Sequence, residues 1–380
     1  MEKQAGRAAA SPTAKSVLVS GASFAGLATA HALNQLGYDV TIVEIAKGVK
    51  KGGTPVNIGG EAKDVLKRMG VLGQVQANRL KMEGVEFKNS DDVTEGAMRH
   101  EPDVARADDD LEIERDTLLD IVFTSVKDDV ELVFNNSIAA LDETENEINV
   151  SFQDGTKRTF ALVFGCDGNH SLVRKLQFGD EAEYAHFLGQ YFSITIVDKL
   201  LIRENTTQIY NVPGKAVMLN AYNNKTDIIL CFSSEKEISY DYRDEAQQRK
   251  IISEQFAGQG WRTQELLGEV GRSKTFYFDK VNQIKMPSWV KGRVALVGDA
   301  AYCASPAAGM GGSLAIIGAG ALADAFEKNH GNFKLAFQDY NKSFRPFIEG
   351  VQAHALKTLD ALIPKTDEAI RKRNAQTNPW

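Results

Sequence analysis

Three short segments, far apart along the chain, repeat one pattern in which an apolar run ends in glycine or aspartate. They occupy residues 16–26 (SVLVSGASFAG), 165–174 (GCDGNHSLVR) and 292–301 (GRVALVGDAA). In an open α/β sheet, ligands bind beyond the carboxyl ends of the strands. One such segment is a weak indication of ligand binding. Three in this order and spacing indicate one large cofactor held by three strand ends.

The first segment has the features of a nucleotide-binding turn. Residues 17–19 form the aliphatic run of a buried strand, and Gly21 permits the tight turn after it. Gly26 allows the next helix to pack close to the strand, so that the helix N-terminus faces a pyrophosphate. Ser23 stands where the middle glycine of such turns is usual. The intervening residues Phe24 and Ala25 belong to the same expected contact.

A second strand is expected at residues 40–43, and it ends at Glu44. An acidic side chain about 20 residues past the glycines suits a ribose hydroxyl. Taken alone, this unit has an alternative interpretation as a strand–helix turn of the core without a nucleotide. The two later segments argue against that alternative.

The second and third segments follow the same logic. Residues 160–164 form an apolar run before Asp167-Gly168, and residues 294–297 do so before Gly298-Asp299. Asp299 is placed to accept hydrogen bonds from the ribityl hydroxyls of a flavin. The next stretch, residues 306–314 (PAAGMGGSL), predicts a loop whose backbone N–H groups face a ligand, followed by a helix. Its N-terminus would stabilise negative charge on a reduced flavin. The cofactor indicated is non-covalent FAD.

The combined motifs resemble class A FAD-dependent aromatic monooxygenases of the para-hydroxybenzoate hydroxylase type. The likeness runs from about residue 16 to residue 347, and the Gly-Asp-Ala-Ala block with the Pro-x-x-Gly-x-Gly loop is specific to it. Within that class, residues 276–303 and 51–54 are most similar to the short tetracycline-inactivating monooxygenases, the tetracycline destructases. Arg115-Asp116 with Leu118 matches a basic–acidic pair of the family. The sequence departs from the family at Met310, Ser313 and Asn57, where Gln, Asn and Asp are usual.

The segments and the resemblance together define an expected FAD site. Its residues are Gly21, Ser23, Phe24, Ala25, Gly26, Glu44, Lys51, Gly53, Thr54, Asn57, Arg115, Asp167, Gly168, Gly298, Asp299, Pro306, Gly309, Met310, Gly311 and Gly312.

The resemblance implies that NADPH reduces FAD and that O2 then gives a flavin C4a-hydroperoxide, which hydroxylates a phenolic or enolic polycyclic substrate such as a tetracycline. A smaller phenol or another aromatic polyketide is an alternative substrate, and a redox-sensing flavoprotein is the non-enzyme alternative. A flavin halogenase would carry a Trp-x-Trp-x-Ile-Pro segment, but Trp261, Trp289 and Trp380 are isolated. No catalytic base is assigned, because the flavin carries the chemistry.

The segments between the motifs predict a second domain on a mostly antiparallel sheet. Residues 187–197, 209–222 and 227–233 have strand character, and residues 223–226 (NNKT) predict a hairpin turn. In the family this sheet covers the substrate. The candidate substrate contacts are Tyr191, Ser193, Thr195, Met218, Asn220 and Pro306.

The domain division follows from these predictions. We expect a discontinuous, Rossmann-like α/β FAD-binding domain over residues 16–80, 105–177 and 275–340, and a substrate domain over residues 81–104 and 178–274. A polar helix is expected at residues 244–256. Residues 341–380 predict a C-terminal bridging helix that Pro364 breaks, with core packing and substrate gating both open as its role.

Composition limits the partners and the compartment. The net charge of −7 with mixed signs does not favour nucleic acid, and no apolar run is long enough for a membrane span. Residues 1–15 lack the apolar core of a signal peptide and are expected to be a disordered tail. Cys166, Cys231 and Cys303 indicate free thiols in a reducing, cytoplasmic setting. The scattered histidines show no metal-ligand spacing, His170 is interpreted as a surface residue of a turn, and we expect a monomer.

Overall fold

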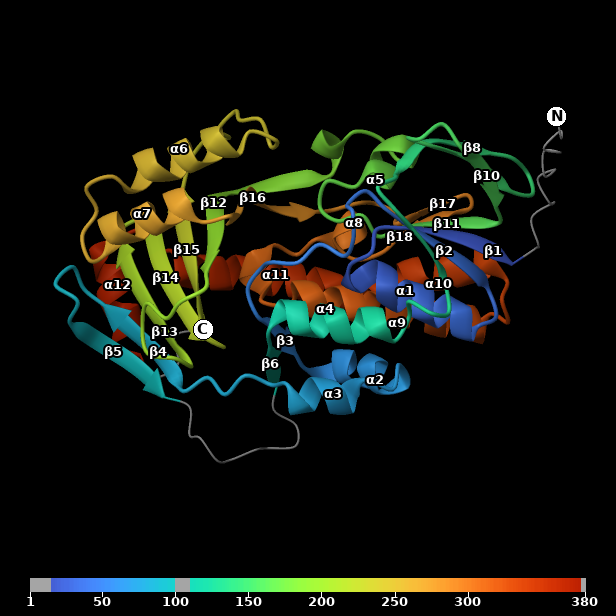
Figure 1. Cartoon of the computed structure of the whole chain (residues 1–380). Coiled ribbons are helices and arrows are strands. Elements are labelled where there is room, and N and C mark those ends of the chain that lie inside the picture. The colour runs from blue at the N-terminus through green and yellow to red at the C-terminus, as the bar shows by residue number, and fades with distance from the viewer. Residues whose placement is uncertain (1–14, 100–109, 377–380) are drawn as a thin grey trace, which may run out of the picture.

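The computed structural model describes residues 15–99 and 110–376 (Figure 1). The tail expected over residues 1–15 therefore lies, except for Lys15, outside the described residues. So do residues 105–109 of the second expected FAD segment and the last four residues of the C-terminal one.

A six-stranded, mostly parallel sheet brings the three motif segments together. Its strand order is β17-β18-β11-β1-β2-β7. β1 (Ser16–Ser20) runs parallel to β11 (Leu162–Gly165) and to β2 (Asp39–Glu44), and β11 runs parallel to β18 (Val294–Leu296). β7 (Glu131–Phe134) and the antiparallel β17 (Val290–Lys291) form the edges. The predicted α/β class is thereby confirmed.

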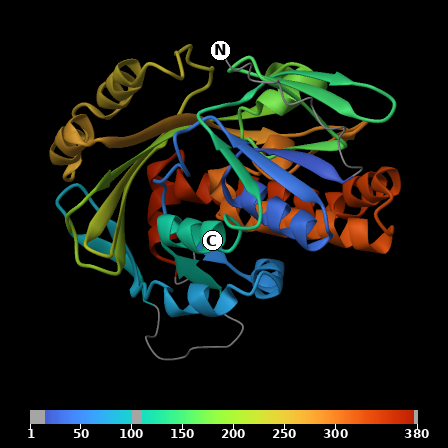
Figure 2. The same cartoon turned by 45° about the vertical axis from the view of Figure 1, so that its right-hand side comes forward.

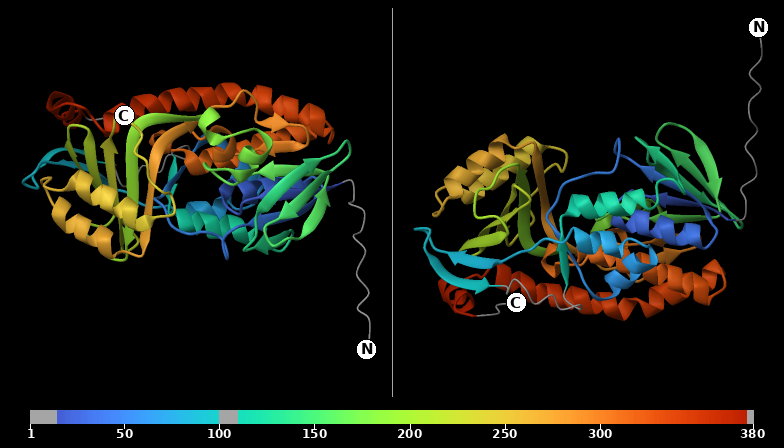
Figure 3. Two further views of the ribbon diagram at one scale, coloured as in Figure 1. Left: turned by 90° about the horizontal axis from the view of Figure 1, so that it is seen from above. Right: turned by 60° about the horizontal axis from the view of Figure 1, so that its bottom comes forward.

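Helices and a small sheet cover this sheet. Figures 1 and 3 show α1 (Phe24–Gln35), α4 (Arg115–Thr124) and α9 (Gly311–Lys328) on one face. The antiparallel sheet of β8 (Ile138–Glu143), β9 (Ile148–Phe152) and β10 (Lys157–Phe160) lies on the other. The remaining short elements of this part are β3 (Val56–Ile58), β6 (Leu111–Ile113), α2 (Gly60–Arg68), α3 (Leu72–Ala77), α5 (Leu172–Gln177), η1 (Glu181–Glu183), α8 (Asp299–Tyr302) and η2 (Pro306–Ala308).

A seven-stranded sheet forms the second part of the molecule, as Figure 2 shows. Its order is β16-β12-β15-β14-β13-β4-β5, with every pair antiparallel except β13 and β4. The strands are β4 (Gly84–Lys88), β5 (Thr94–Arg99), β12 (Ala185–Val197), β13 (Thr206–Val212), β14 (Lys215–Tyr222), β15 (Lys225–Ser233) and β16 (Thr275–Ile284). By strand pairing, residues 275–284 go with this sheet, whereas the sequence division put them with the FAD-binding part.

One strand prediction in this sheet is corrected and one turn is confirmed. Residues 209–222 are not one strand, because Pro213 removes a backbone donor and Gly214, at φ +74°, turns the chain. The hairpin between β14 and β15 turns at Asn223 and Asn224, at φ +46° and +59°, where asparagine tolerates the left-handed region.

Helices complete both parts. α6 (Glu245–Phe256), capped by Asp244, and α7 (Thr263–Arg272) lie on the outer face of the seven-stranded sheet. α10 (Phe333–Ser343) and α11 (Arg345–Leu362) run along the molecule past both sheets (Figure 3), and α12 (Asp367–Asn374) follows the break at Pro364. In the described ranges no helix combines the length and the apolar character needed to cross a bilayer.

Gly26 sits where α1 crosses the turn after β1. A Cβ built there would lie 1.9 Å from the carbonyl oxygen of Gly21, which is backbone and has no flexible end to yield. The close helix–strand packing expected from the sequence therefore requires glycine at this position.

We expect Gly26→Ala to destabilise the fold by about 3 kcal/mol, since overpacking forces the backbone to shift. The measurement is the midpoint of urea unfolding, in the absence of added cofactor. Gly350→Ala is the matched control, because a Cβ at that helical position meets nothing within 4 Å. The free energy of unfolding of the control should rise by up to about 1 kcal/mol, because alanine has a higher helix propensity than glycine. Equal midpoints for the two variants would contradict the packing constraint.

Candidate functional site

Two adjoining cavities lie between the six-stranded and the seven-stranded sheet. The larger, about 420 Å³, is walled by the loop of residues 50–54, by Arg115 and Asp299, by residues 303–306 and by residues of β16. The smaller, about 210 Å³, lies under the seven-stranded sheet. Thr54, Phe192, Ile194 and Pro306 line both, so the two cavities share a wall.

The larger cavity lies at aligned strand ends. Ser20 of β1 pairs with Gly165 of β11, and Gly165 pairs with Leu296 of β18. Each strand ends at the same level, and the turns after them come within contact distance. At Gly21, which has φ +105°, a Cβ would lie 2.5 Å from the carbonyl oxygen of Cys166. The first two motif segments therefore touch through backbone.

Glu44 is fixed at the end of β2. Its carboxylate accepts hydrogen bonds from the backbone N–H of Ala22 at 2.8 Å and of Ala46 at 2.9 Å. The first bond ties the acid to the turn after β1, the position expected for a group that meets a nucleotide ribose.

Arg115, the first residue of α4, organises the loop of residues 50–54. It donates to the carbonyl of Gly52 at 2.8 Å, and Asp116 accepts from the N–H of Gly52 at 2.8 Å. The guanidinium also lies over the ring of Phe24, 5.3 Å from its centre, and 3.5 Å from the hydroxyl of Ser23. Burial lowers the pKa of Arg115, which nonetheless stays cationic.

The three other residues of this loop in the expected site are Lys51, Gly53 and Thr54, and their surroundings differ. Gly53 has φ +112°, and a Cβ there would come within 2.7 Å of the Arg115 side chain. The Lys51 ammonium binds Asp120 at 2.6 Å, with both side chains more than half exposed, so its charge faces solvent. Thr54 lies in the wall between the cavities.

Asp167 caps a helix instead of lining the cavity. Its carboxylate accepts from the backbone N–H of Leu172 at 2.8 Å and of Val173 at 3.0 Å, and from the Ser171 hydroxyl. Burial raises the pKa of this carboxyl, and these bonds oppose the rise. The next residue, Gly168, has φ +81°, and Asn169 after it lines the larger cavity.

Asp299 and the loop after it close the cavity at the third strand end. Burial raises the pKa of Asp299 to about 6, and the Cys303 thiol and the Arg115 charge limit the rise. Gly298 brings the turn close to α1, since a Cβ there would lie 2.9 Å from that of Ala25. Pro306 opens a short 3-10 turn that ends at Gly309, φ +64°, and Met310 precedes α9, which begins at Gly311.

Two further residues of the expected site serve packing in this structure. A Cβ at Gly312 would come within 2.6 Å of the Val56 side chain, so the glycine lets α9 approach β3. The side chain of Asn57 is exposed, and it is the backbone carbonyl of Asn57 that accepts from the Ser313 hydroxyl. The departures from the family at positions 57 and 313 thus meet in one contact.

Several polar atoms in the wall of the larger cavity have no partner among the described residues. They are Asn169 Oδ1, Asn282 Nδ2 and Ser305 Oγ, all buried. A buried polar atom left unpaired costs about 1–3 kcal/mol. The residues present therefore fit a ligand with both donors and acceptors, as a flavin nucleotide has.

The prediction for β12 chose the wrong face of the strand. Tyr191, Ser193 and Thr195 are fully buried on the face under α6 and α7, where Tyr191 stacks on Phe232. The alternate residues Gln190, Phe192 and Ile194 line the smaller cavity. Side chains alternate between faces, and nothing in the local pattern marked the cavity side. Met218, Asn220 and Pro306 do line the smaller cavity.

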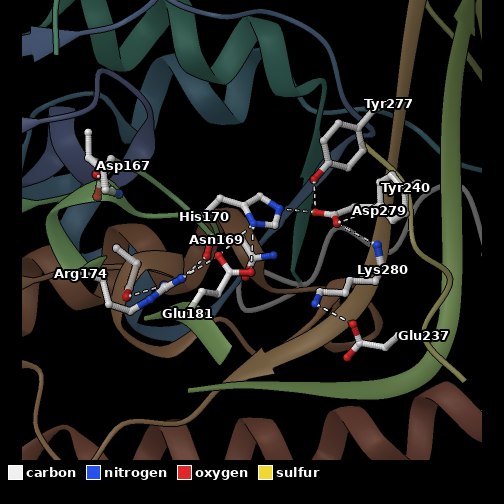
Figure 4. Close-up of polar contacts among 12 residues, drawn as sticks. Asp167, Asn169, His170, Arg174, Glu181, Glu237, Tyr240, Tyr277, Asp279 and Lys280 are labelled. Atoms are coloured by element: carbon white, nitrogen blue, oxygen red, sulfur yellow. Dashed lines mark hydrogen bonds and ion pairs between the residues drawn. The ribbon is translucent and has the colours of Figure 1, made fainter. Parts of the chain in front are cut away.

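His170 belongs to an ionic network that its interpretation as a surface residue of a turn overlooked (Figure 4). Its Nδ1 lies 3.0 Å from Glu181 and its Nε2 lies 3.1 Å from Asp279. Asp279 also accepts from the hydroxyls of Tyr277 at 2.8 Å and Tyr240 at 3.2 Å. Because Asp279 and Tyr277 line the larger cavity, the network joins the turn after β11 to β16 at the cavity rim.

The charges in this network stabilise one another. The hydrogen bonds to Asp279 and Glu181 raise the pKa of His170 to about 10. Burial opposes ionisation of Asp279, but the contact with His170 outweighs it and lowers the pKa. At neutral pH the network therefore holds an imidazolium between two carboxylates.

Comparison with known proteins agrees with this geometry. Residues 14–330 match the family described as FAD binding domain. A flavin-dependent monooxygenase of Legionella longbeachae is 32% identical over 356 residues, 92% of this chain and 90% of that protein. A Mycobacterium tuberculosis protein without an assigned activity is 35% identical over 345 residues, 88% of this chain and 91% of that protein. The crystal structure of tetracycline destructase Tet(51) superposes with a TM-score of 0.85 at 30% identity, covering 95% of this chain and 94% of that chain.

The fold and the site thus define an FAD-binding protein of the flavin-dependent monooxygenase class. The chain belongs to the class A family of FAD-dependent monooxygenases, and the likeness to the tetracycline destructases drawn from residues 51–54 and 276–303 is confirmed at the level of the whole fold.

We expect the contribution of the ionic network to the stability of the fold to fall as the pH rises above neutral. The pKa of His170 rises from 6.5 in the unfolded chain to about 10 in the fold. The contribution of His170 to the free energy of unfolding is therefore complete below about pH 6.5 and is lost as the pH rises to about 10. The gap in melting temperature between wild type and His170→Gln should narrow over that window. His186→Gln, at an exposed position of β12, is the control. A gap for His170→Gln that stays constant from pH 6.5 to 10 would disprove the assignment.

Proposed function

We propose that this protein is an NADPH-dependent monooxygenase that hydroxylates a phenolic or enolic polycyclic substrate, with a tetracycline as the first compound to test. The observation that carries the proposal is the pair of adjoining cavities: one at three aligned strand ends, the other apolar and covered by an antiparallel sheet. The likeness to Tet(51), a tetracycline destructase, supports the choice of compound.

In this proposal the larger cavity holds FAD. Glu44 meets the ribose, the N-termini of α1 and α9 face the pyrophosphate and the flavin, and Asp299 accepts from the ribityl chain. Bound FAD would supply the redox chemistry, which needs two electrons from NADPH and one oxygen atom of O2. The overall balance is substrate C–H + O2 + NADPH + H⁺ giving substrate C–OH + H2O + NADP⁺.

The chain's own residues bind, orient and exclude water. Phe192 and Ile194 form the apolar wall between the cavities, and Met218 and Leu359 extend it over the substrate side. A dry cavity protects reactive intermediates from side reactions with water. We propose the domain division in the same terms: the segments that build the six-stranded sheet, which lie on both sides of β16 in the chain, hold FAD, and the seven-stranded sheet covers the substrate.

The volume of the smaller cavity favours a second candidate, a smaller phenol. About 210 Å³ is below the ~300–1,000 Å³ usual for sites of drug-sized ligands. A four-ring substrate would need part of the larger cavity beside the flavin, or a displaced end of α11. A single-ring phenol needs neither.

The purified protein should be yellow and hold FAD non-covalently. Heat-denatured protein should release FAD, identified by chromatography against FMN and NAD standards. Release of FMN or NAD, or failure to take up FAD on reconstitution, would refute the cofactor assignment.

Asp299→Ala should weaken FAD binding without unfolding the chain. Loss of a charge-assisted hydrogen bond of ~1.5–3 kcal/mol corresponds to a tenfold to hundredfold rise in Kd. Fluorescence titration of the apoprotein with FAD measures it. Asp324→Ala, on the exposed side of α9 in a surface ion pair with Arg68, is the matched control. Unchanged affinity for Asp299→Ala would mean that this carboxylate does not contact the cofactor.

The activity itself is tested by product mass. Incubation of a tetracycline with the FAD-loaded protein, NADPH and O2 should add one oxygen atom, and omission of NADPH should abolish the change. NADPH oxidation that yields only hydrogen peroxide with tetracyclines, but a hydroxylated product with a single-ring phenol, would replace the first substrate by the second.

A further inference from the structure

The smaller cavity is apolar along most of its wall, but one end is acidic. That end is formed by Glu112 of β6 and Asn220 of β14, next to Thr54 and Pro55. Among the residues that the structure describes, the Glu112 carboxylate has neither a hydrogen bond nor an ion pair, and burial raises its pKa. A carboxylate in such a setting lacks the cation or donor that would normally accompany it.

A second carboxyl group lies behind this end. Asp227 is directly opposite Asn220 in the β14–β15 pair, so both side chains project from the same face of the sheet. Asp227 is fully buried, and Tyr222 donates to its Oδ1 at 2.9 Å while its Oδ2 has no partner. Burial raises the pKa of Asp227 to about 7; Glu114 and Glu112 add to the rise, and Tyr222 and Lys225 oppose it.

The cations nearby do not compensate for these two acids. Lys225 is ion-paired with Glu114, which Asn223 also contacts at 2.9 Å. Arg115 is engaged with the loop carbonyls and with Asp116. Among the described residues at this end of the cavity, Glu112 and Asp227 are therefore the acidic groups that lack a counter-charge.

Building on the function proposed above, we propose that this acidic end is a subsite for a protonated amine of the substrate, with Glu112 as its counter-ion and the Asn220 amide oxygen as a second acceptor. The partner is organic and not a metal ion, because two carboxyl groups and one amide supply fewer than the six or more oxygens that hard cations require, and the described residues contain no metal-binding cluster. The apolar remainder of the cavity, including Ile194, Met218 and Ile229, would pack against the rings that carry the amine.

The polar groups at the two ends of the smaller cavity also determine how the ligand would be oriented in it. Asn220 lies level with Asp227, and Asp227 pairs with Ile196, whereas Gln190 lies six residues back along β12 at the other end of the cavity. Six residues of strand span about 20 Å. Gln190 is buried with its Oε1 unpaired, so a ligand group at that end can donate a hydrogen bond to this oxygen. The cavity therefore suits an elongated substrate with an ammonium group at one end and a hydroxyl or amide donor at the other.

The test uses matched compounds that differ only in the amine. A tetracycline with its dimethylamino group and the 4-dedimethylamino analogue are titrated into the FAD-loaded protein, and binding is followed by the change in flavin absorbance. Wild type should bind the amine-bearing compound about tenfold to a hundredfold more tightly, the range for hydrogen bonds to charged groups. Single-ring phenols with and without a tertiary amine form a second matched pair.

Glu112→Gln keeps the size of the side chain and removes the charge. It should abolish the preference by weakening only the amine-bearing compounds, with KM raised and kcat little changed. Glu61→Gln, an exposed acid in the first turn of α2, is the control and should keep the wild-type preference. FAD content and melting temperature of each variant verify that the fold is retained.

The outcomes separate this inference from the proposed function. Equal binding of amine-bearing and amine-free partners by wild type in both pairs overturns the subsite, even when oxygen transfer occurs. An equal loss for both partners in Glu112→Gln overturns it as well. Conversely, an amine preference that depends on Glu112, in a protein that transfers oxygen to none of the compounds, upholds the subsite and overturns the proposed substrates.

Discussion

Ser20, Gly165 and Leu296 lie side by side across three parallel strands, and this shared register fixes the site. Because the strands end at one level, the turns after them carry Gly21, Asp167 and Asp299 to the same edge of the sheet. The turns approach so closely that side chains would collide: a Cβ at Gly21 would meet the Cys166 carbonyl, and one at Gly298 would meet Ala25. The glycines of the motifs are therefore requirements of backbone contact as well as of cofactor access.

The second sheet is tied to that edge by charge as well as by chain connectivity. β16 leads from the seven-stranded sheet into the third motif segment, and its Asp279 binds His170 of the second segment. Phe192 of the neighbouring strand packs on Tyr277, with ring centres 5.6 Å apart. The position of the wall between the two cavities consequently depends on an ion pair at the rim of the larger one.

Local interactions between neighbouring residues explain which parts of the fold could be predicted from the sequence. Neighbouring residues encode the strand ends, the Asn223–Asn224 hairpin and the helix break at Pro364. The structure shows all three where the sequence predicts them. The division of residues 209–222 was also marked locally, by Pro213-Gly214, but strand propensity on both sides concealed it. The face of β12 was not marked, because buried residues such as Tyr191 and Phe192 occupy both faces of a strand between a cavity and two helices.

Long-range contacts explain what remained hidden. His170 is the exposed turn residue that the sequence indicated, but its ion pair remained hidden because its partner Asp279 lies 109 residues away. Glu112 sits on a three-residue strand, and only the fold reveals that its carboxylate faces a cavity. Asp167 shows the opposite case: its position in the motif suggested cofactor contact, whereas its carboxylate is occupied by the first turn of α5. A motif thus identifies a strand end reliably, but the partners of each side chain depend on the whole fold.

The C-terminal helix α11 is bonded to the rest of the molecule at two places along its length. In its middle, the Gln352 amide donates to the carbonyl of Ile284 at 2.9 Å, and the Gln352 carbonyl accepts from Gln283 at 2.7 Å, which fixes α11 to the end of β16. At its end, the carbonyl of Leu362 accepts from Asn211 of β13 at 3.1 Å. Lifting the helix end alone would break that bond, at about 0.5–1.5 kcal/mol, and expose Leu359. Both contacts of α11 are with the seven-stranded sheet, because Gln283 and Ile284 end β16 and Asn211 lies in β13. The sheet therefore holds the helix both in its middle and at its end, and keeps Leu359 in the wall of the smaller cavity.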